Sequence, residues 1–167
     1  MTARNLPRWQ IRRDYTACSE IAAALHDWDE SDILDHNRQR NGIASVVEID
    51  DRIVGWVAYT LHESHVYVHN IASINWRQDV FESLIQRLIN RAAVSQSRRD
   101  MIVIAVPDRC DDALVMLRGC GFLVVGQIDG MIQMRYTIPI ITELVEIDGI
   151  TCRRVSGFPV LLPDTRK

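Results

Sequence analysis

The sequence has no long apolar run. No stretch approaches the roughly 20 consecutive apolar residues that a membrane-spanning helix needs. The opening MTARNLPRWQIRR is not followed by the apolar core of a secretory signal. We therefore expect a cytoplasmic protein that has no membrane partner.

Cysteine is scarce and follows no recognisable pattern. The four cysteines lie far apart, without C-x-x-C spacing and without a histidine at ligand spacing. A free cysteine generally behaves as a small buried hydrophobic residue. We expect reduced thiols, no disulfide framework and no metal site.

The sequence also lacks a strong excess of one charge. Nineteen basic and 22 acidic residues are interspersed and give a formal net charge of −3. A surface for nucleic acid or for an anionic membrane needs clustered basic residues, so neither partner is predicted. The length of 167 residues, 47% of them hydrophobic, suits one globular domain with a sizeable core.

The N-terminal third predicts one strand and two helices. Residues 9–13 have the composition of a short strand, and residues 15–28 carry apolar side chains at the spacing of one helix face. Thr16 is the expected N-cap of that first helix. A second helix is predicted over residues 31–41, opened at its first or second residue.

Three antiparallel strands are predicted next. Residues 44–49 and 53–61 are rich in β-branched and aromatic side chains, with Asp50-Asp51 between them as a tight turn. Residues 65–74 alternate as a third strand. The alternation predicts one face made of His65, Tyr67, His69, Ile71 and Ser73, and an opposite face made of Val66, Val68, Asn70 and Ala72.

Helix and strand patterns then alternate. Residues 81–94 have apolar side chains at helical spacing and predict an amphipathic helix that packs on a sheet. Residues 101–106 form a continuous apolar run that is typical of a strand buried on both faces. Residues 111–118 predict a short helix that ends at Gly119.

The C-terminal third predicts two hairpins. Strands over residues 122–128 and 131–138 are joined at Asp129-Gly130. Residues 140–167 contain a second hairpin signal at Asp148-Gly149. We therefore divide the chain into a main domain, residues 1–139, and a C-terminal hairpin arm, residues 140–167.

The element order and two local motifs resemble the GNAT superfamily of N-acetyltransferases. The family's fourth strand resembles Val68-His69-Asn70-Ile71-Ala72-Ser73, and its late helix with a final Gly-Phe pair resembles the stretch from Asp112-Ala113-Leu114 to Gly119-Cys120-Gly121-Phe122. The resemblance covers residues 9–138, and in element order it is similar to the ribosomal-protein alanine acetyltransferases. It implies an α/β (α+β) fold with a mixed, mostly antiparallel central sheet flanked by helices, here followed by the hairpin extension.

The resemblance also implies a binding site for acetyl-coenzyme A. In the family the fourth and fifth strands splay apart, and the pantetheine arm bonds to free backbone groups of the fourth strand, here Ile71, Ala72 and Ser73. The pyrophosphate binds to the N-terminus of the following helix, because unpaired N–H groups and the helix dipole attract anions there. This chain's residues at that position are Arg77, Gln78, Asp79, Val80, Phe81 and Glu82, and Cys110 falls on the family's cofactor-contacting Asn.

The chain departs from the family pattern in several places. The family's phosphate loop, Q/R-x-x-G-x-G/A, is replaced by a loop without glycine, in which Trp76 either lines or blocks the groove. Asp79 and Glu82 add negative charge that is repulsive to phosphate unless Arg77 offsets it.

Two catalytic positions of the family have also changed. The Tyr that protonates the leaving thiolate falls on Leu117. The Glu that acts as base in the ribosomal-protein branch falls on Ala105.

The remaining candidates for proton transfer are His69 and Tyr67. Histidine titrates near neutral pH and tyrosine can donate a proton. The alternative interpretation is that this strand face packs under a helix, with its histidines hydrogen bonded at the rim. A metal site of His65 and His69 is not expected, because residues four apart on a strand lie about 13 Å apart.

Two functions from different classes follow. The first is an N-acetyltransferase that moves an acetyl group from acetyl-coenzyme A to a primary amine of a protein or small molecule. The alternative is a catalytically degenerate GNAT-fold binding or assembly module with weak or no coenzyme A binding. This module would form a homo-oligomer through the C-terminal arm, with residues 140–167 adding strands to a sheet.

Overall fold

The computed structural model describes residues 1–5, 12–94, 99–138, 143–147, 150–154 and 161–163. In chain order the elements are β1 (Thr2–Asn5), α1 (Arg12–Ser19), α2 (Glu30–Arg38), β2 (Gly42–Ile49), β3 (Arg52–Leu61), β4 (His65–Ser73), the 3-10 turn η1 (Ile74–Trp76), α3 (Gln78–Val94), β5 (Met101–Pro107), α4 (Asp111–Gly119), β6 (Leu123–Ile128), β7 (Met131–Thr137), β8 (Glu143–Ile147), β9 (Ile150–Arg154) and β10 (Leu161–Pro163).

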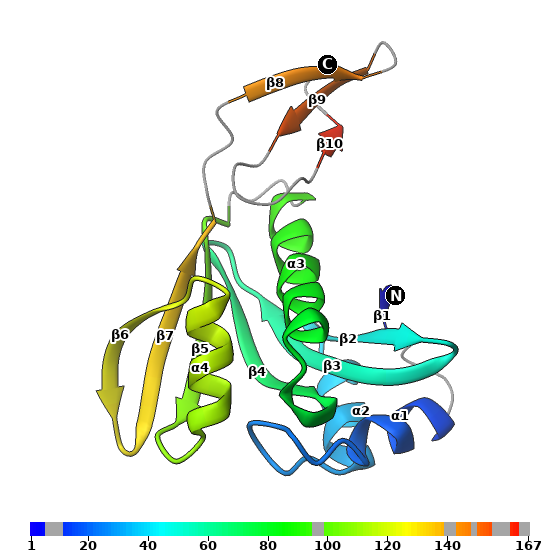
Figure 1. Cartoon of the computed structure of the whole chain (residues 1–167), viewed down its shortest axis with the longest axis vertical. Coiled ribbons are helices and arrows are strands. Elements are labelled where there is room, and N and C mark those ends of the chain that lie inside the picture. Colours follow the sequence, from blue (N-terminus) through cyan, green and yellow to red (C-terminus); the bar gives the residue numbers. More distant parts are fainter. Residues whose placement is uncertain (6–11, 95–98, 139–142, 148–149, 155–160, 164–167) are drawn as a thin grey trace.

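The main sheet has seven strands in the order β1-β2-β3-β4-β5-β7-β6 (Figure 1). Every neighbouring pair is antiparallel except β4 and β5, which are parallel and are connected through α3. The predicted mixed, mostly antiparallel sheet flanked by helices is therefore confirmed. Strands β8, β9 and β10 form a separate antiparallel sheet, so the predicted C-terminal hairpin gains a third strand. The turn residues Asp148-Gly149 lie outside the described residues, and the division of the chain at residue 139 stays a prediction.

Each face of the main sheet has its own hydrophobic core. Helices α3 and α4 cover one face, where Phe81, Leu84 and Leu88 of α3 are fully buried. Helices α1 and α2 cover the other face, where the indole of Trp56 is buried and donates a hydrogen bond of 2.8 Å to the carbonyl of Cys18. Full burial of each such apolar side chain contributes about 1.5–3 kcal/mol.

The two predicted tight turns are confirmed by the backbone. Asp50 and Asp51 join β2 to β3 with φ of 49° and 59°. Asp129 and Gly130 join β6 to β7 with φ of 49° and 74°. Two consecutive positive φ values match the twist of a hairpin, which explains why aspartate and glycine are used.

The N-terminal predictions were wrong in their boundaries. The first strand is β1, whereas residues 12 and 13 of the predicted strand begin α1 and residues 9–11 lie outside the described residues. Helix α1 ends at Ser19 instead of residue 28, and Thr16 lies inside it, not at its N-cap. The residues after Ser19 have apolar side chains at helical spacing but do not continue the helix, because Ala23 and Leu25 hydrogen bond to β4 instead.

Helix α2 begins earlier than predicted. Asp29 is its N-cap and accepts hydrogen bonds from the backbone N–H groups of Ser31 and Asp32, while the carboxylate of Asp32 accepts one from the backbone of Asp29. This reciprocal capping box uses two aspartates.

Among the described residues, no helix is both long and apolar enough to span a bilayer.

Candidate active site at a fork between two strands

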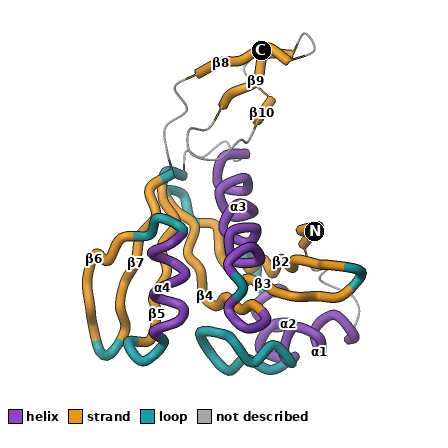
Figure 2. Tube along the Cα trace, viewed as in Figure 1, coloured by secondary structure: helices purple, strands orange, loops and turns teal. Residues whose placement is uncertain are grey.

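Strands β4 and β5 form a fork in the middle of the sheet. Their parallel pairing begins at His65 and ends where Val68 lies opposite Ile104. β4 continues to Ser73 and β5 to Pro107, with no pairing between these ends. The two strands therefore diverge as the GNAT resemblance implies, and Figure 2 shows their ends apart.

A β-bulge lies at the start of the fork. On β3, Tyr59 pairs with Val68 and the preceding Ala58 pairs with Asn70, so His69 is an extra residue on β4. Bulges of this kind bend a strand and re-aim its side chains.

The bulge corrects the predicted faces of this strand. Ile71 packs with Val68 in the core beneath α3, and Ala72 packs with Trp56 in the core beneath α1 and α2. The prediction that Ile71 shares a face with His69 was wrong, because one inserted residue reverses the alternation that follows it.

His69 lies at the fork within a group of aromatic and polar side chains. Its ring centroid is 4.9 Å from that of His36 on α2 and 4.8 Å from that of Tyr67. Its Nε2 atom lies 3.0 Å from the hydroxyl of Thr60. Burial, followed by the nearby His36 and His62, lowers the pKa of His69 to about 4, so the ring is neutral at pH 7.

A small cavity of about 290 Å³ opens beside His69. It is lined by Trp28, Asp32, Asp35, His36, Gln39 and His69. The two carboxylates suit a cationic group, and the neutral imidazole can accept a proton only weakly because its pKa is far below neutrality. This cavity therefore combines two carboxylates with a neutral imidazole.

His36 was not among the predicted site residues. It is buried, its Nε2 lies 3.1 Å from the carbonyl oxygen of Tyr59, and burial lowers its pKa. The signal was present in the sequence, because Ile33, His36 and Asn37 follow helical spacing and all three are buried.

His65, which the alternation places on the same strand face as His69, lies away from the fork. The ring of His65 stacks on that of His62 with centroids 4.6 Å apart, near the start of β4. Among the described residues, no group of three or more His, Cys, Asp or Glu side chains is arranged to hold a metal ion.

The glycine-free loop turns with two left-handed residues. Asn75 and Trp76 both have φ of 51°. Asparagine tolerates this conformation, whereas a bulky residue such as tryptophan rarely adopts it, at a cost of order 1–3 kcal/mol. The ring of Trp76 packs on Phe81, with centroids 5.9 Å apart, so Trp76 closes over the start of α3.

The N-terminus of α3 already carries an anion from the chain itself. Arg77 donates two hydrogen bonds to Asp79, from Nε at 3.0 Å and from Nη2 at 2.6 Å. These bonds to Arg77 lower the pKa of Asp79 most, and bonds from the backbone N–H groups of Val80 and Asp79 itself also lower it. The Asp79 carboxylate thus occupies donors that the resemblance assigns to pyrophosphate, and Arg77 is neutralised nearby.

The adjoining predicted contacts are also internal. Gln78 donates a hydrogen bond of 2.8 Å to the carboxylate of Glu82. Cys110 stands immediately before α4, and burial raises the pKa of its thiol. Leu117 is fully buried in the core, and Ala105 pairs with Gln133 on β7, so neither position provides an acid or base.

The free edge of β4 is covered by the connection between α1 and α2. Leu25 N–H bonds to the carbonyl oxygen of Ile71 at 3.1 Å, and Ser73 N–H bonds to the carbonyl oxygen of Ala23 at 3.0 Å. In Figure 2 this connection is the teal loop below β4. Two backbone groups that the resemblance assigns to pantetheine are therefore bonded within the chain. In contrast, the hydroxyl of Ser73 is buried without a hydrogen-bond partner among the described residues.

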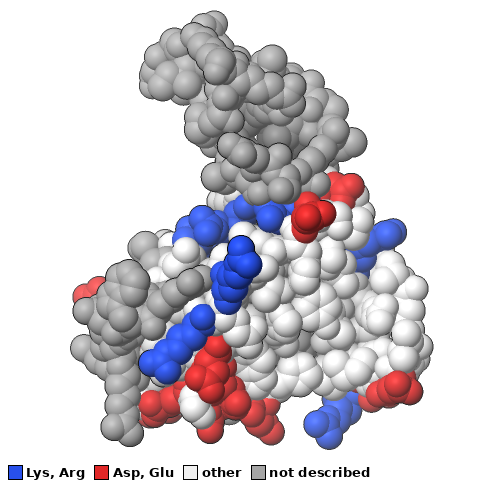
Figure 3. Space-filling view, turned by 180° about the vertical axis from the view of Figure 1, so that it is seen from behind, with Lys and Arg blue, Asp and Glu red and all other residues white. Residues whose placement is uncertain are grey.

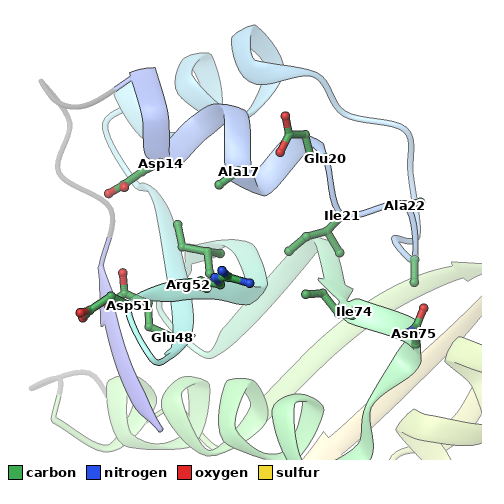
Figure 4. A pocket seen from close by; sticks show the side chains of 12 residues that line it. Asp14, Ala17, Glu20, Ile21, Ala22, Glu48, Asp51, Arg52, Ile74 and Asn75 are labelled. Carbon is green, nitrogen blue, oxygen red and sulfur yellow. The ribbon is translucent and has the colours of Figure 1, made fainter.

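A larger cavity of about 890 Å³ lies between α1, the β2–β3 turn and the start of the glycine-free loop (Figure 4). Its charged lining consists of four carboxylates and one guanidinium: Asp14, Glu20, Glu48, Asp51 and Arg52. The cavity extends to Ile74 and Asn75, which lie at the other end of the view from Asp14 and Asp51 (Figure 4). Figure 3 shows the face opposite to that of Figure 1. Acidic and basic side chains occur together on this face, and several acidic ones lie along its lower edge.

No family model and no curated protein matches this sequence. Solved structures match over most of the chain. The ribosomal-protein-S18-alanine N-acetyltransferase from Escherichia coli has a TM-score of 0.65 at 17% identity, over 87% of this chain and 99% of that chain. Aminoglycoside 6'-acetyltransferase type Ii has a TM-score of 0.65 at 14% identity, over 82% and 97%.

A third solved structure contains coenzyme A. Spermidine N-acetyltransferase from Vibrio cholerae, in complex with CoA and spermine, matches with a TM-score of 0.58 at 15% identity, over 81% of this chain and 94% of that chain. These similarities span nearly the whole of each solved chain. The protein therefore has the fold of the GNAT N-acetyltransferases.

Proposed function

We propose that this protein is a GNAT-type acyltransferase that moves an acetyl group from acetyl-coenzyme A to a primary amine of a protein or small molecule. The observation that carries the proposal is the fork between β4 and β5, which begins at the bulged His69. A fork leaves one edge of a central strand without a neighbouring long strand. Ala23 and Leu25 cover that edge here, and an extended ligand that replaces them can bond to the backbone.

The fit of coenzyme A differs between its two ends. Toward the pantetheine arm, Ser73 fits, because its buried hydroxyl lacks a partner among the described residues and a buried polar group without one is costly. Toward the pyrophosphate, the Asp79 carboxylate opposes binding by its charge. Binding is therefore expected to be weaker than in a protein whose helix N-terminus is free.

The chain's own residues have definable roles in acyl transfer. Coenzyme A supplies the acetyl group as a thioester when it is bound. Asp32 and Asp35 attract a protonated amine into the 290 Å³ cavity. The amine would have to lose a proton to water before it reacts. Neutral His69 would then take up the second proton, which the amine nitrogen releases as it bonds to the acetyl carbon, and the departing thiolate would be protonated by water. Because the pKa of His69 is about 4, we expect much of the rate enhancement to come from proximity.

Specific observations favour a second candidate, the degenerate binding or assembly module. Leu117 is packed in the core, so no acid replaces the family's tyrosine at that position. Asp79 and residues 23–25 bond to the backbone groups that the cofactor would need. Assembly through residues 140–167 remains part of this second candidate.

Isothermal titration with acetyl-coenzyme A tests the choice. We expect the wild-type protein to bind with micromolar affinity and Arg77→Glu to weaken binding by about tenfold or more, because two acidic residues would then meet the phosphates. Arg135→Glu on the exposed part of β7 is the matched charge control and should bind like the wild type. No heat at millimolar ligand would refute the acyltransferase and favour the module.

A further inference from the structure

Residues 22–26, which we name the closing segment, form a short strand-like pairing with β4. Ala24 and Ala72 are antiparallel bridge partners. The bonds from Leu25 to Ile71 and from Ser73 to Ala23 flank this bridge on either side. The closing segment therefore adds a local strand to the sheet.

The position of this pairing follows from the sheet order. β3 pairs with Ile71, Ala72 and Ser73 along one edge of β4. A strand has only two edges, so the closing segment occupies the other edge, which is the edge paired with β5 before the fork. The closing segment therefore occupies the edge of β4 that β5 leaves unpaired beyond Val68.

Asn70 holds the end of the closing segment. Its side chain is fully buried, Oδ1 accepts a hydrogen bond of 3.2 Å from the backbone N–H of His26, and Nδ2 donates one of 2.9 Å to the carbonyl oxygen of His26. Burial and then the positive charge of Arg109 lower the pKa of His26. Because Arg109 follows β5, the closing segment extends toward the far side of the fork.

The attachment of the closing segment is small compared with that of a regular strand. It has one bridge, and its side chains at positions 22, 23 and 24 are all alanines. Only Leu25 is a buried apolar residue of the closing segment. Segments with few buried apolar contacts open at lower free energy than core strands.

We propose that the closing segment is a displaceable strand that shuts the fork, and that an extended ligand with amide groups must displace it to bond Ile71 and Ser73. The pantetheine arm has this chemistry, so the ligand part of this inference rests on the proposed function. The protein then has a closed state, described here, and an open state in which the ligand replaces the closing segment.

A reversible cross-link tests this competition. Ala24 and Ala72 face each other between the two flanking bonds, and such pairs have the short Cα separation that suits a disulfide. In Ala24→Cys/Ala72→Cys, the oxidised protein should lose at least about 100-fold in affinity for coenzyme A relative to the same protein after reduction. Ala24→Cys alone, oxidised and reduced in the same way, should show no difference. If the reduced double variant binds coenzyme A and the oxidised form binds it equally well, the proposal is overturned.

Amide hydrogen exchange provides a readout that does not require coenzyme A. In the wild-type protein, the amides of Leu25 and Ser73 should exchange together and faster than those of the β2–β3 pairing. His26→Pro removes the N–H that bonds to Asn70 and should speed this exchange further, which tests the attachment even if the cysteine variant does not fold.

The two readouts separate the two proposals. If Leu25 and Ser73 exchange only through global unfolding, the closing segment is a permanent part of the sheet and the inference is wrong. If they open locally while the reduced double variant and the wild type bind no coenzyme A, the displaceable strand stands and the acyltransferase proposal fails.

Discussion

Arg77 and Asp79 form a bidentate ion pair at the first turn of α3, with the shorter contact at 2.6 Å. Both side chains are about half exposed, so the pair itself adds little to stability. We expect the pair to act on phosphate binding, because the Asp79 carboxylate already bonds to Arg77 and to N–H groups at the start of α3.

Asp79→Asn should therefore strengthen coenzyme A binding. The change removes one negative charge beside the phosphates and releases Arg77, and a gain of about tenfold in affinity corresponds to about 1.4 kcal/mol. Titration calorimetry at low salt measures the change. Glu63→Gln, which removes an exposed carboxylate from the β3–β4 connection, is the control for general charge. An unchanged affinity in Asp79→Asn would show that phosphates do not bind at α3.

Asn70→Ala should destabilise the protein. It leaves the backbone N–H of His26 without its partner and removes one of the two hydrogen bonds to the His26 carbonyl oxygen, at a cost of about 1–3 kcal/mol in the free energy of unfolding. Urea denaturation at pH 7 measures this. Asn90→Ala on α3, where Asn90 accepts a hydrogen bond from Gln86, is the control and should change stability by no more than about 0.5 kcal/mol. Equal effects of the two changes would contradict the role of Asn70.

Gly55→Ala should disturb the packing of α3 on the sheet. A Cβ at Gly55 would lie 2.5 Å from Cγ1 of Val80 and 3.0 Å from the carbonyl oxygen of Ala72. We expect a loss of about 1–3 kcal/mol by denaturation, as for other overpacked cores. Gly126→Ala, whose Cβ would meet nothing closer than 3.9 Å, should be nearly neutral. If Gly55→Ala has the same free energy of unfolding as the wild type, α3 can move away from the sheet without cost and the prediction is wrong.

Stability should fall as the pH is lowered from about 6.5 to about 4. The folded-state pKa of His69 is about 4 against an ordinary value of 6.5, so the unfolded chain binds more protons in this window. Stability from this group is fully present above about pH 6.5 and is lost as the pH approaches 4. Urea denaturation at several pH values measures the slope. The slope of the free energy of unfolding against pH is proportional to the number of protons taken up on unfolding, and His69→Gln should reduce that number by up to about one. An unchanged slope would assign the effect to other groups.

The fold was largely predictable because its strong signals are local. The Asp50-Asp51 and Asp129-Gly130 turns were correctly predicted, since consecutive positive φ values suit few residue types. The amphipathic pattern from residue 81 correctly predicted the body of α3, although that helix begins at Gln78. The predicted helix over residues 15–28 failed because hydrogen bonds to β4, a strand far along the chain, replaced its last turns.

The candidate site was only partly predictable. His69 and Tyr67 were chosen from their alternation on one strand, and they do contact each other at the fork. His36 reaches His69 from a different element, so no pattern within β4 indicated it. The roles of His69 and Tyr67 in catalysis remain proposals.

The sequence by itself determined the element order, the hairpin turns, the apolar faces and the loss of glycine from the loop before α3. These properties depend on side-chain type and on spacing within short stretches, so they can be read locally. The bulge at His69 and the closing segment on β4 were decided only by the tertiary structure. Each depends on backbone groups competing for hydrogen-bond partners, and that competition is settled only when distant parts of the chain meet.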